Sequence, residues 1–271
     1  MLVRRRILIG LLAVLPVLAV VGWTAVEYWP HDPPPPLPAP RDPVLPDLAM
    51  APLADLLGAV TEGEGTPRQQ LFFSASIANR GPGPFMINAV RGDEHGQWRV
   101  SQRFLDTGGD LTEAVTPADM TWGGHGHNHW HVRIGAAYSL ESVPGGKEVR
   151  SLEKVGYCFF DQQPYDRAAV GASRLPVFTK NGCDGKSTLT LDMGLSPGWQ
   201  DPYSWALPDQ RLDITGLPDG RYRLVATADP NNWFREVDES NNAAWSLMEI
   251  TTSTSPPVVN VIAQGPAPRK G

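Results

Sequence analysis

Short apolar stretches in which every second residue is hydrophobic recur along the middle of the chain. In one of them Phe73, Ala75 and Ile77 alternate with polar or small residues, and the turn sequence Asn-Arg-Gly-Pro-Gly-Pro follows directly. Successive side chains of a strand point to opposite faces, so this period of two predicts a strand with one buried face. Residues 85–90 and 97–104 have the composition of the next strands.

The second half of the chain continues this pattern. Residues 212–214 precede a Pro-Asp-Gly turn, after which Tyr222, Leu224 and Ala226 alternate. Residues 236–242 then lead to Trp245 and Leu247 and complete a hairpin. We expect a short helix only within residues 46–59. The pattern therefore predicts an all-β chain, folded as an antiparallel β-sandwich with long loops.

Both ends of the chain differ from this middle part. Three arginines at positions 4–6 precede an uncharged apolar run over residues 7–26, which as a helix would just cross a bilayer core of about 30 Å. The arginines should stay in the cytoplasm, so the rest of the chain would be extracytoplasmic. Residues 1–29 are thus a signal peptide or a membrane anchor, and the protein is secreted or membrane-anchored accordingly.

Two further segments should lie outside the folded domain. Residues 30–46 contain nine prolines and predict an extended, semi-rigid linker. Residues 251–271 are polar, contain proline and lack periodicity, which predicts a disordered tail. The folded domain would then occupy residues 45–250.

Charge and cysteine content narrow the possible functions. The net charge of −6, with no basic stripe, argues against a nucleic-acid partner. The two cysteines, Cys158 and Cys183, lie in the exported part, where one disulfide is expected. Closing a loop of about 25 residues would stabilise the fold by roughly 3 kcal/mol. Ligation of a metal by one of the cysteines is the alternative.

The densest chemical signal is a run of histidines. Four of the six histidines in the chain stand at every second position: His125, His127, His129 and His131. On a strand, neighbours in this series lie about 6.5–7 Å apart on one face, so two or three of them can bind one ion, whereas four cannot. Imidazole ligands favour copper, zinc, iron or nickel, and divalent copper binds most tightly. We expect the run to begin a strand that continues to Tyr138.

Three other segments follow the histidines in a specific order. Lys154 stands four residues before Cys158, Tyr203 ends the sequence Ser-Pro-Gly-Trp-Gln-Asp-Pro-Tyr, and the hairpin ending at Asn242 comes last. Together with the histidines these segments resemble the catalytic domain of the lysyl oxidase family over residues 45–250. The single export segment and the short domain resemble bacterial members.

The resemblance implies specific roles for these residues. The family's three copper-binding histidines fall on His127, His129 and His131, and no role carries over to His125. The family's self-made cofactor, lysine tyrosylquinone, would form from Lys154 and Tyr203. The implied activity is that of a protein-lysine 6-oxidase-like copper amine oxidase. It converts peptidyl lysine or other primary amines to aldehydes and releases hydrogen peroxide and ammonia.

Each part of this machinery has a physical reason. A quinone accepts electrons from an amine, which no ordinary side chain does. Making a quinone from tyrosine needs a redox metal, which excludes zinc. Burial should lower the pKa of the lysine amine so that it can attack the ring. A carboxylate must remove a proton from the substrate, and of the two near Tyr203, Asp201 and Asp209, we favour Asp201.

The same residues are compatible with two other functions. The same histidines could serve an extracytoplasmic copper-binding protein without oxidase activity, or a zinc- or iron-dependent hydrolase or oxygenase. The expected partners of the oxidase are an amine or a lysine-containing protein or peptide, O₂, and the membrane through the N-terminal segment. A covalent peptide joining Lys154 to Tyr203 would distinguish the oxidase from both alternatives.

Overall fold

The computed structural model describes residues 37–39, 42–62, 65–123, 128–154, 156–208 and 210–266, with Lys154 described by its backbone alone. These residues belong to one compact unit of the chain. Their regular elements are antiparallel strands and one short 3₁₀ helix, Lys180–Cys183, which confirms the all-β prediction. No helix of this part of the chain is long and apolar enough to span a membrane. The apolar run 7–26 and most of the proline-rich linker lie outside the described residues.

One sheet is built around the longest strand, β4 (Arg68–Asn79), which pairs with four other strands. They are β2 (Leu48–Met50), β3 (Ala54–Thr61), β14 (Trp199–Tyr203) and β15 (Arg211–Asp213). The sixth strand of the sheet, β12 (Gln163–Pro164), pairs with β14. The predicted alternation holds here, because Phe73, Ala75 and Ile77 are all buried.

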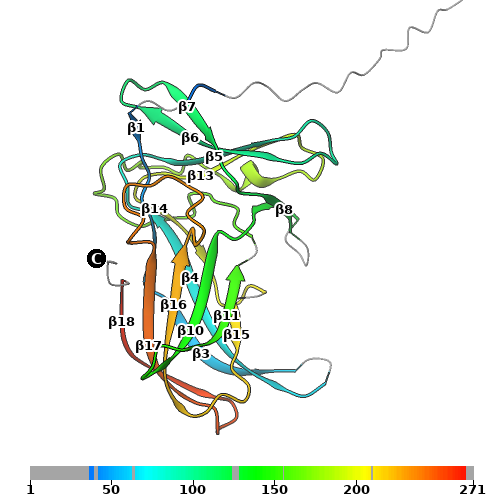
Figure 1. Cartoon of the computed structure of the whole chain (residues 1–271), viewed down its shortest axis with the longest axis vertical. Coiled ribbons are helices and arrows are strands. Elements are labelled where there is room, and N and C mark those ends of the chain that lie inside the picture. Colours follow the sequence, from blue (N-terminus) through cyan, green and yellow to red (C-terminus); the bar gives the residue numbers. More distant parts are fainter. Residues whose placement is uncertain are drawn as a thin grey trace, which may run out of the picture. The chain divides into compact units, whose positions relative to one another are not determined.

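A second sheet packs against the first (Figure 1). Its order is β11 (Glu148–Lys154), β10 (Ala136–Val143), β16 (Gly220–Ala228), β17 (Ala243–Thr251) and β18 (Val258–Pro266). The ring of Tyr138 on β10 meets the ring of Phe73 on β4 with centroids 4.7 Å apart. This contact lies in the hydrophobic core that both sheets share.

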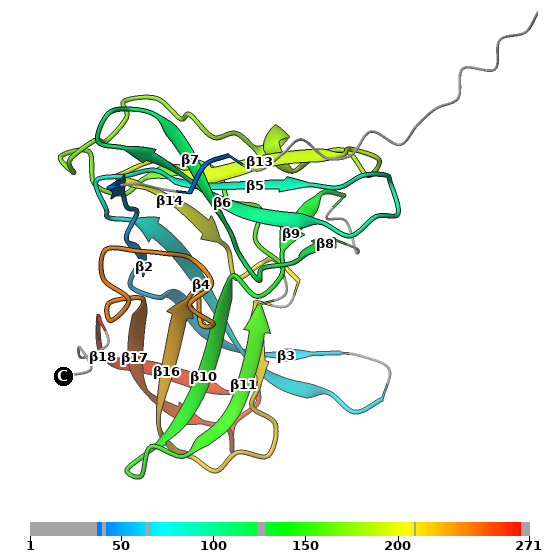
Figure 2. The same ribbon diagram turned by 45° about the horizontal axis from the view of Figure 1, so that its top comes forward.

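A third sheet lies across one end of the other two, as Figure 2 shows. It consists of β1 (Pro43–Val44), β5 (Phe85–Val90), β6 (Arg99–Asp106), β7 (Leu111–Val115) and β13 (Thr190–Leu195). Phe85 joins this sheet to the common core, since its ring contacts the rings of Phe159 and Phe234. The domain is therefore a sandwich extended by a third sheet.

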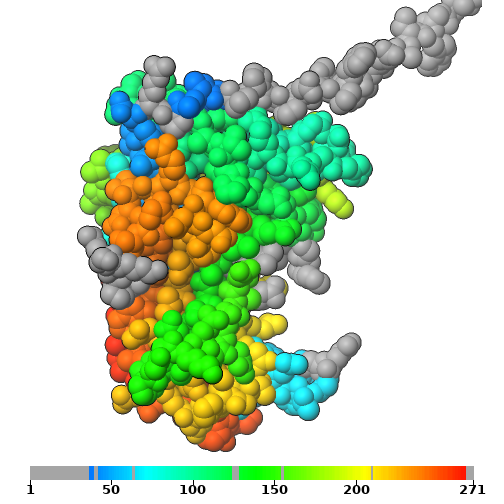
Figure 3. Space-filling model, in the orientation of Figure 1, coloured from blue at the N-terminus to red at the C-terminus, as the bar shows by residue number. Residues whose placement is uncertain are grey.

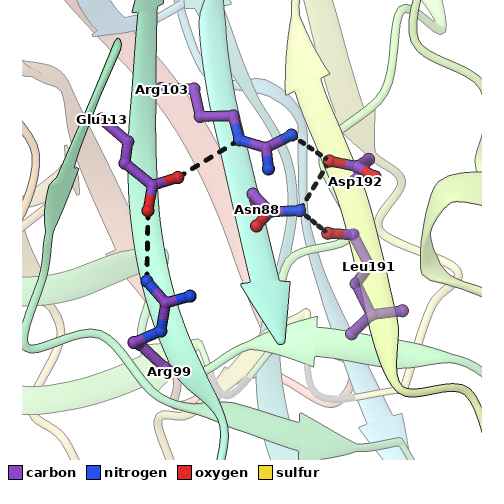
Figure 4. Close-up of polar contacts among 6 residues, drawn as sticks. All are labelled: Asn88, Arg99, Arg103, Glu113, Leu191 and Asp192. Carbon is purple, nitrogen blue, oxygen red and sulfur yellow. Dashed lines mark hydrogen bonds and ion pairs between the residues drawn. The ribbon is translucent and has the colours of Figure 1, made fainter. Parts of the chain in front are cut away.

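Charged side chains tie the strands of this third sheet together (Figure 4). The buried carboxylate of Glu113 on β7 accepts hydrogen bonds from Arg99 at 3.1 Å and Arg103 at 3.4 Å, both on β6. Arg103 also donates to Asp192 on β13, which in turn accepts from Asn88 on β5. The buried charge of Glu113 is thus paired, as burial of a carboxylate requires.

Two sequence predictions are wrong. Residues 46–59 contain strands β2 and β3 instead of a short helix. The backbone of β3 comes so close to Pro257 that a Cβ atom at Gly58 would lie 2.2 Å from the Pro257 carbonyl oxygen. The tail expected to be disordered forms β18, which pairs with β17 from Val258 to Pro266. Val258, Val259, Val261 and Ile262 carry the strand propensity that the polar composition of the tail concealed.

Candidate functional site

The histidine segment belongs to a small separate ribbon. Strands β8 (Met120–Trp122) and β9 (Trp130–Val132) pair with each other and with no strand of the three larger sheets. The prediction of one strand from the histidines to Tyr138 is wrong, because a turn separates β9 from β10. Ile134, in that turn, has a positive φ of 57°, which ends the strand.

Two of the predicted copper ligands lie together in this ribbon. The rings of His129 and His131 have centroids 4.4 Å apart; His131 is buried and His129 is half-buried. Alternate positions therefore place these two imidazoles side by side, as the period of two implies. His125 and His127 lie outside the described residues. The assignment of three copper ligands stays a prediction.

Gly156 fits directly against His131. A Cβ atom at this position would lie 2.8 Å from Cγ of the imidazole, and the φ of Gly156 is +122°. Both facts require glycine here. The next residue, Tyr157, exchanges backbone hydrogen bonds of 2.8 and 3.0 Å with Val132 of β9. The segment that follows Lys154 is therefore attached to the histidine ribbon.

The same segment also contacts Tyr203. The backbone N–H of Cys158 donates to the phenol oxygen of Tyr203 at 3.1 Å. Cys158 forms the predicted disulfide with Cys183, with Cα atoms 5.9 Å apart, which confirms the pairing and excludes a free cysteine ligand. Lys154 is the last residue of β11, and its backbone pairs with Ala136. Residues 154–158 thus connect the lysine, the histidine ribbon and the tyrosine.

Asp201 and Tyr203 occupy alternate positions of β14 and are both buried. Burial raises the pKa of Asp201 well above its ordinary value, and the nearby charge of Asp161 adds to this shift. Oδ1 of Asp201 accepts from Gln162 at 3.4 Å, whereas Oδ2 has no hydrogen-bond partner among the described residues. Burial, and then the charge of Asp201, raise the pKa of the Tyr203 phenol well above its ordinary value. Asp209, the other candidate base, lies outside the described residues.

Two more tyrosines surround this pair, and the sequence did not point to them. The Tyr157 ring lies 4.2 Å from the Tyr203 ring, and its hydroxyl is 3.2 Å from that of Tyr138. Gln210 donates to the Tyr138 hydroxyl at 3.2 Å. Burial raises the pKa of Tyr157 well above its ordinary value. In the sequence, Tyr157 stands out only by its place between Gly156 and Cys158. A strand pattern could not predict the direction of its side chain, because β11 already ends at Lys154.

Comparison with known families decides the classification. A family model described as lysyl oxidase matches residues 92–256, more than half of the chain. The chain belongs to the lysyl oxidase family. The match includes the histidine run, Lys154 and Tyr203, and so covers the residues that carried the resemblance in sequence. A comparison with curated proteins found no match.

The residues present suit the copper and quinone that the lysyl oxidase family uses. Adjacent imidazoles are ligands that copper accepts, and Gly156 leaves room for the His131 ring. Tyr203 supplies the phenol that a tyrosine-derived quinone requires, in a buried place close to a carboxyl group.

The hairpin between β16 and β17 holds a group of carboxylates in this lysyl oxidase domain. Asp229, Glu236 and Glu239 bring carboxylate oxygens within 4.8 Å of one another. The segment lies between β16 and β17, coloured orange on the face shown in Figure 3. Burial, followed by the charges of Glu239 and Asp229, raises the pKa of Glu236 to about 9, although hydrogen bonds from Leu48 and Asn242 oppose this rise.

Proposed function

We propose that this protein is an extracytoplasmic copper-dependent amine oxidase that makes its own lysine tyrosylquinone from Lys154 and Tyr203. One observation carries the proposal: a single segment, residues 156–158, contacts His131 at one end and the Tyr203 phenol at the other. Membership of the lysyl oxidase family supports the same activity. The disulfide supports an oxidising compartment outside the cytoplasm.

The overall reaction converts a primary amine, O₂ and water to an aldehyde, ammonia and hydrogen peroxide. Peptidyl lysine or a small primary amine would be the substrate. His127, His129 and His131 would hold the copper. When bound, copper and the quinone supply the redox chemistry: the metal supports oxidation of the tyrosine, and the quinone takes electrons from the amine.

The protein's own residues would perform the binding and proton transfers. The Cys158 N–H orients the phenol oxygen of Tyr203 before the quinone is made. Asp201 would take the proton from the carbon next to the substrate nitrogen, on its unpartnered Oδ2 atom. The raised pKa of Asp201 favours keeping that proton once it has been transferred. Tyr203 is buried and lines a pocket together with Gln162, Gln200 and Ser204, through which an amine substrate would reach it.

The direct test is a peptide map of the full chain, purified with copper and oxygen. The wild type should contain a covalent peptide joining Lys154 to Tyr203, show a quinone chromophore and release peroxide from primary amines. Tyr203→Phe should lose all three while keeping stoichiometric copper, because no histidine is altered. Lys154→Ala should likewise lack the mature cofactor.

Tyr165→Phe provides the matched control, since this tyrosine is exposed and outside the site. It should retain the cross-link and the activity. Amine oxidation that persists in Tyr203→Phe would refute the quinone assignment. Copper bound without any cross-link in the wild type would support the alternative of a copper-binding protein without oxidase activity.

A further inference from the structure

Arg91, which follows β5, is almost completely buried, with 4% of its surface exposed. Its guanidinium group donates hydrogen bonds to three backbone carbonyls, those of Glu94, Lys186 at 2.7 Å and Thr188 at 2.8 Å. No carboxylate side chain takes part in these bonds, so the cation is held by the backbone of two loops. The loop 186–188 follows directly after the disulfide residue Cys183 and the short helix.

The guanidinium group also lies against two indole rings. Its Cζ atom is 4.5 Å from the centroid of Trp98 and 4.8 Å from that of Trp130. The Trp130 indole N–H donates to the carbonyl of Gly185 at 3.0 Å. Trp98 and Trp122 contact the Trp130 ring as well, with centroids 5.0 and 5.4 Å away. A desolvated cation over an aromatic face gives an oriented attraction.

Trp130 is the first residue of β9 and stands between His129 and His131 in the sequence, so this contact acts on the histidine ribbon itself. Strands of three residues are short, and a two-stranded ribbon alone is marginally stable. At the end of β9, the backbone bridge between Val132 and Tyr157 holds the ribbon. At the start of β9, contacts with Arg91 and Gly185 hold the Trp130 ring.

We propose that Arg91 is a positioning residue for the metal site: through Trp130 it sets the placement of the His129 and His131 imidazoles. This inference rests on the proposed function, in which these histidines bind copper. Arg91 would act on these histidines through the Trp130 ring. It connects them to the loop after Cys183, and hence through the disulfide to Cys158 and Tyr203.

The test measures copper binding and the copper spectrum of the full chain. Arg91→Lys keeps the charge, but a lysine cannot lie flat against two indoles or donate in the guanidinium pattern. We expect the copper dissociation constant to rise at least tenfold and the Cu(II) hyperfine splitting in electron paramagnetic resonance to change. A purely structural role would lower the folded fraction but leave the spectrum of the folded molecules unchanged.

Two further variants make the result decisive. Trp130→Phe keeps an aromatic ring near the guanidinium but loses the bond to Gly185, so it should change the spectrum with a smaller loss of affinity. Arg223→Lys removes a comparable contact with Trp245, 5.6 Å away on the second sheet, and should leave both readouts unchanged.

A wild-type spectrum and an affinity within twofold of wild type in Arg91→Lys would overturn the proposal. If that variant does not fold, wild-type values in Trp130→Phe would overturn it. Failure of the wild type to bind copper would instead refute the proposed function.

Discussion

The backbone N–H of Cys158 donates a hydrogen bond of 3.1 Å to the phenol oxygen of Tyr203, a residue 45 positions away in the sequence. Both residues are buried, and Cys158 is also bound covalently to Cys183. The tyrosine that we assign to the cofactor is therefore fixed against the disulfide. A change at the disulfide should consequently affect both stability and cofactor formation.

The disulfide can be tested by the double replacement Cys158→Ala and Cys183→Ala. We expect a loss of about 3 kcal/mol in the free energy of unfolding, because the bond closes a loop of intermediate length. Urea unfolding measures this loss. The quinone chromophore should also develop more slowly, since the Cys158 backbone is less firmly held. Thiol titration of the unfolded wild type should find no reactive thiol, and two thiols would contradict the structure.

Gly156→Ala tests the contact with His131. The new Cβ would overlap the imidazole at 2.8 Å, so the ring must shift and the copper affinity should fall at least tenfold. Gly145→Ala is the matched control, because Gly145 has a φ of +120° but no atom within 4 Å of a Cβ. It introduces the same backbone strain without the clash. Equal copper affinities in the two variants would show that Gly156 does not support the metal site.

Asp201→Asn tests the proposed base. The amide keeps the shape of the side chain but cannot accept a proton, so turnover should fall by about 10²–10⁴-fold. In the wild type, activity should rise with pH as the carboxyl ionises, at a pH above the ordinary range of an aspartate because its pKa is raised. Steady-state rates across pH measure both effects. Asp110→Asn, at an exposed position in the turn between β6 and β7, should change neither.

The stability of the protein should depend on pH through Glu236. Its pKa is raised from 4.5 to about 9 in the folded state, so the folded state binds this proton more tightly than the unfolded state. The stabilisation is complete below pH 4.5 and is lost as the pH rises toward 9. Glu236→Gln should therefore be more stable than the wild type at pH 8 and gain less at pH 5.

Urea midpoints at the two pH values, measured with a chelator present, give this comparison. The chelator prevents stray cations from neutralising the three carboxylates. The exposed Glu249 provides the control, since Glu249→Gln should follow the wild type at both pH values. A Glu236→Gln midpoint that parallels the wild type throughout would contradict the raised pKa.

The C-terminal strand gives a prediction of a different kind. Ending the chain after Ser253 removes β18 and uncovers the edge of β17, including the Ser246 hydroxyl that accepts from Gln264 at 2.8 Å. We expect a loss of at least about 2 kcal/mol in the free energy of unfolding. Ending the chain after Pro266 retains β18 and should leave stability unchanged. Equal stabilities of the two truncated chains would contradict a stabilising role of β18 and would support the expectation of a disordered tail.

The alternation of apolar and polar residues predicted those strands that bury one face in the core. The alternation at Phe73 and Tyr222 and the strand at Phe85 were predicted correctly. The Cys158–Cys183 bond was predicted from the presence of two cysteines in an exported chain. The polarity of the tail hid the β-branched residues of β18, which pairs with β17. A period of two at the histidines could not reveal the turn at Ile134. The partners of the site, Arg91 and Tyr157, depend on long-range packing that spacing does not encode.

The β8–β9 ribbon is held by side-chain contacts and a single bridge, and this has a consequence for the order of folding and metal binding. Among the described residues, the ribbon has no strand pairing with the three large sheets. Small units of this kind open locally at a lower free energy than global unfolding requires. We therefore expect the imidazoles to become accessible while the rest of the domain and its disulfide stay intact. If these histidines bind copper as proposed, the metal would enter after oxidative folding, without a chaperone that keeps the whole chain unfolded.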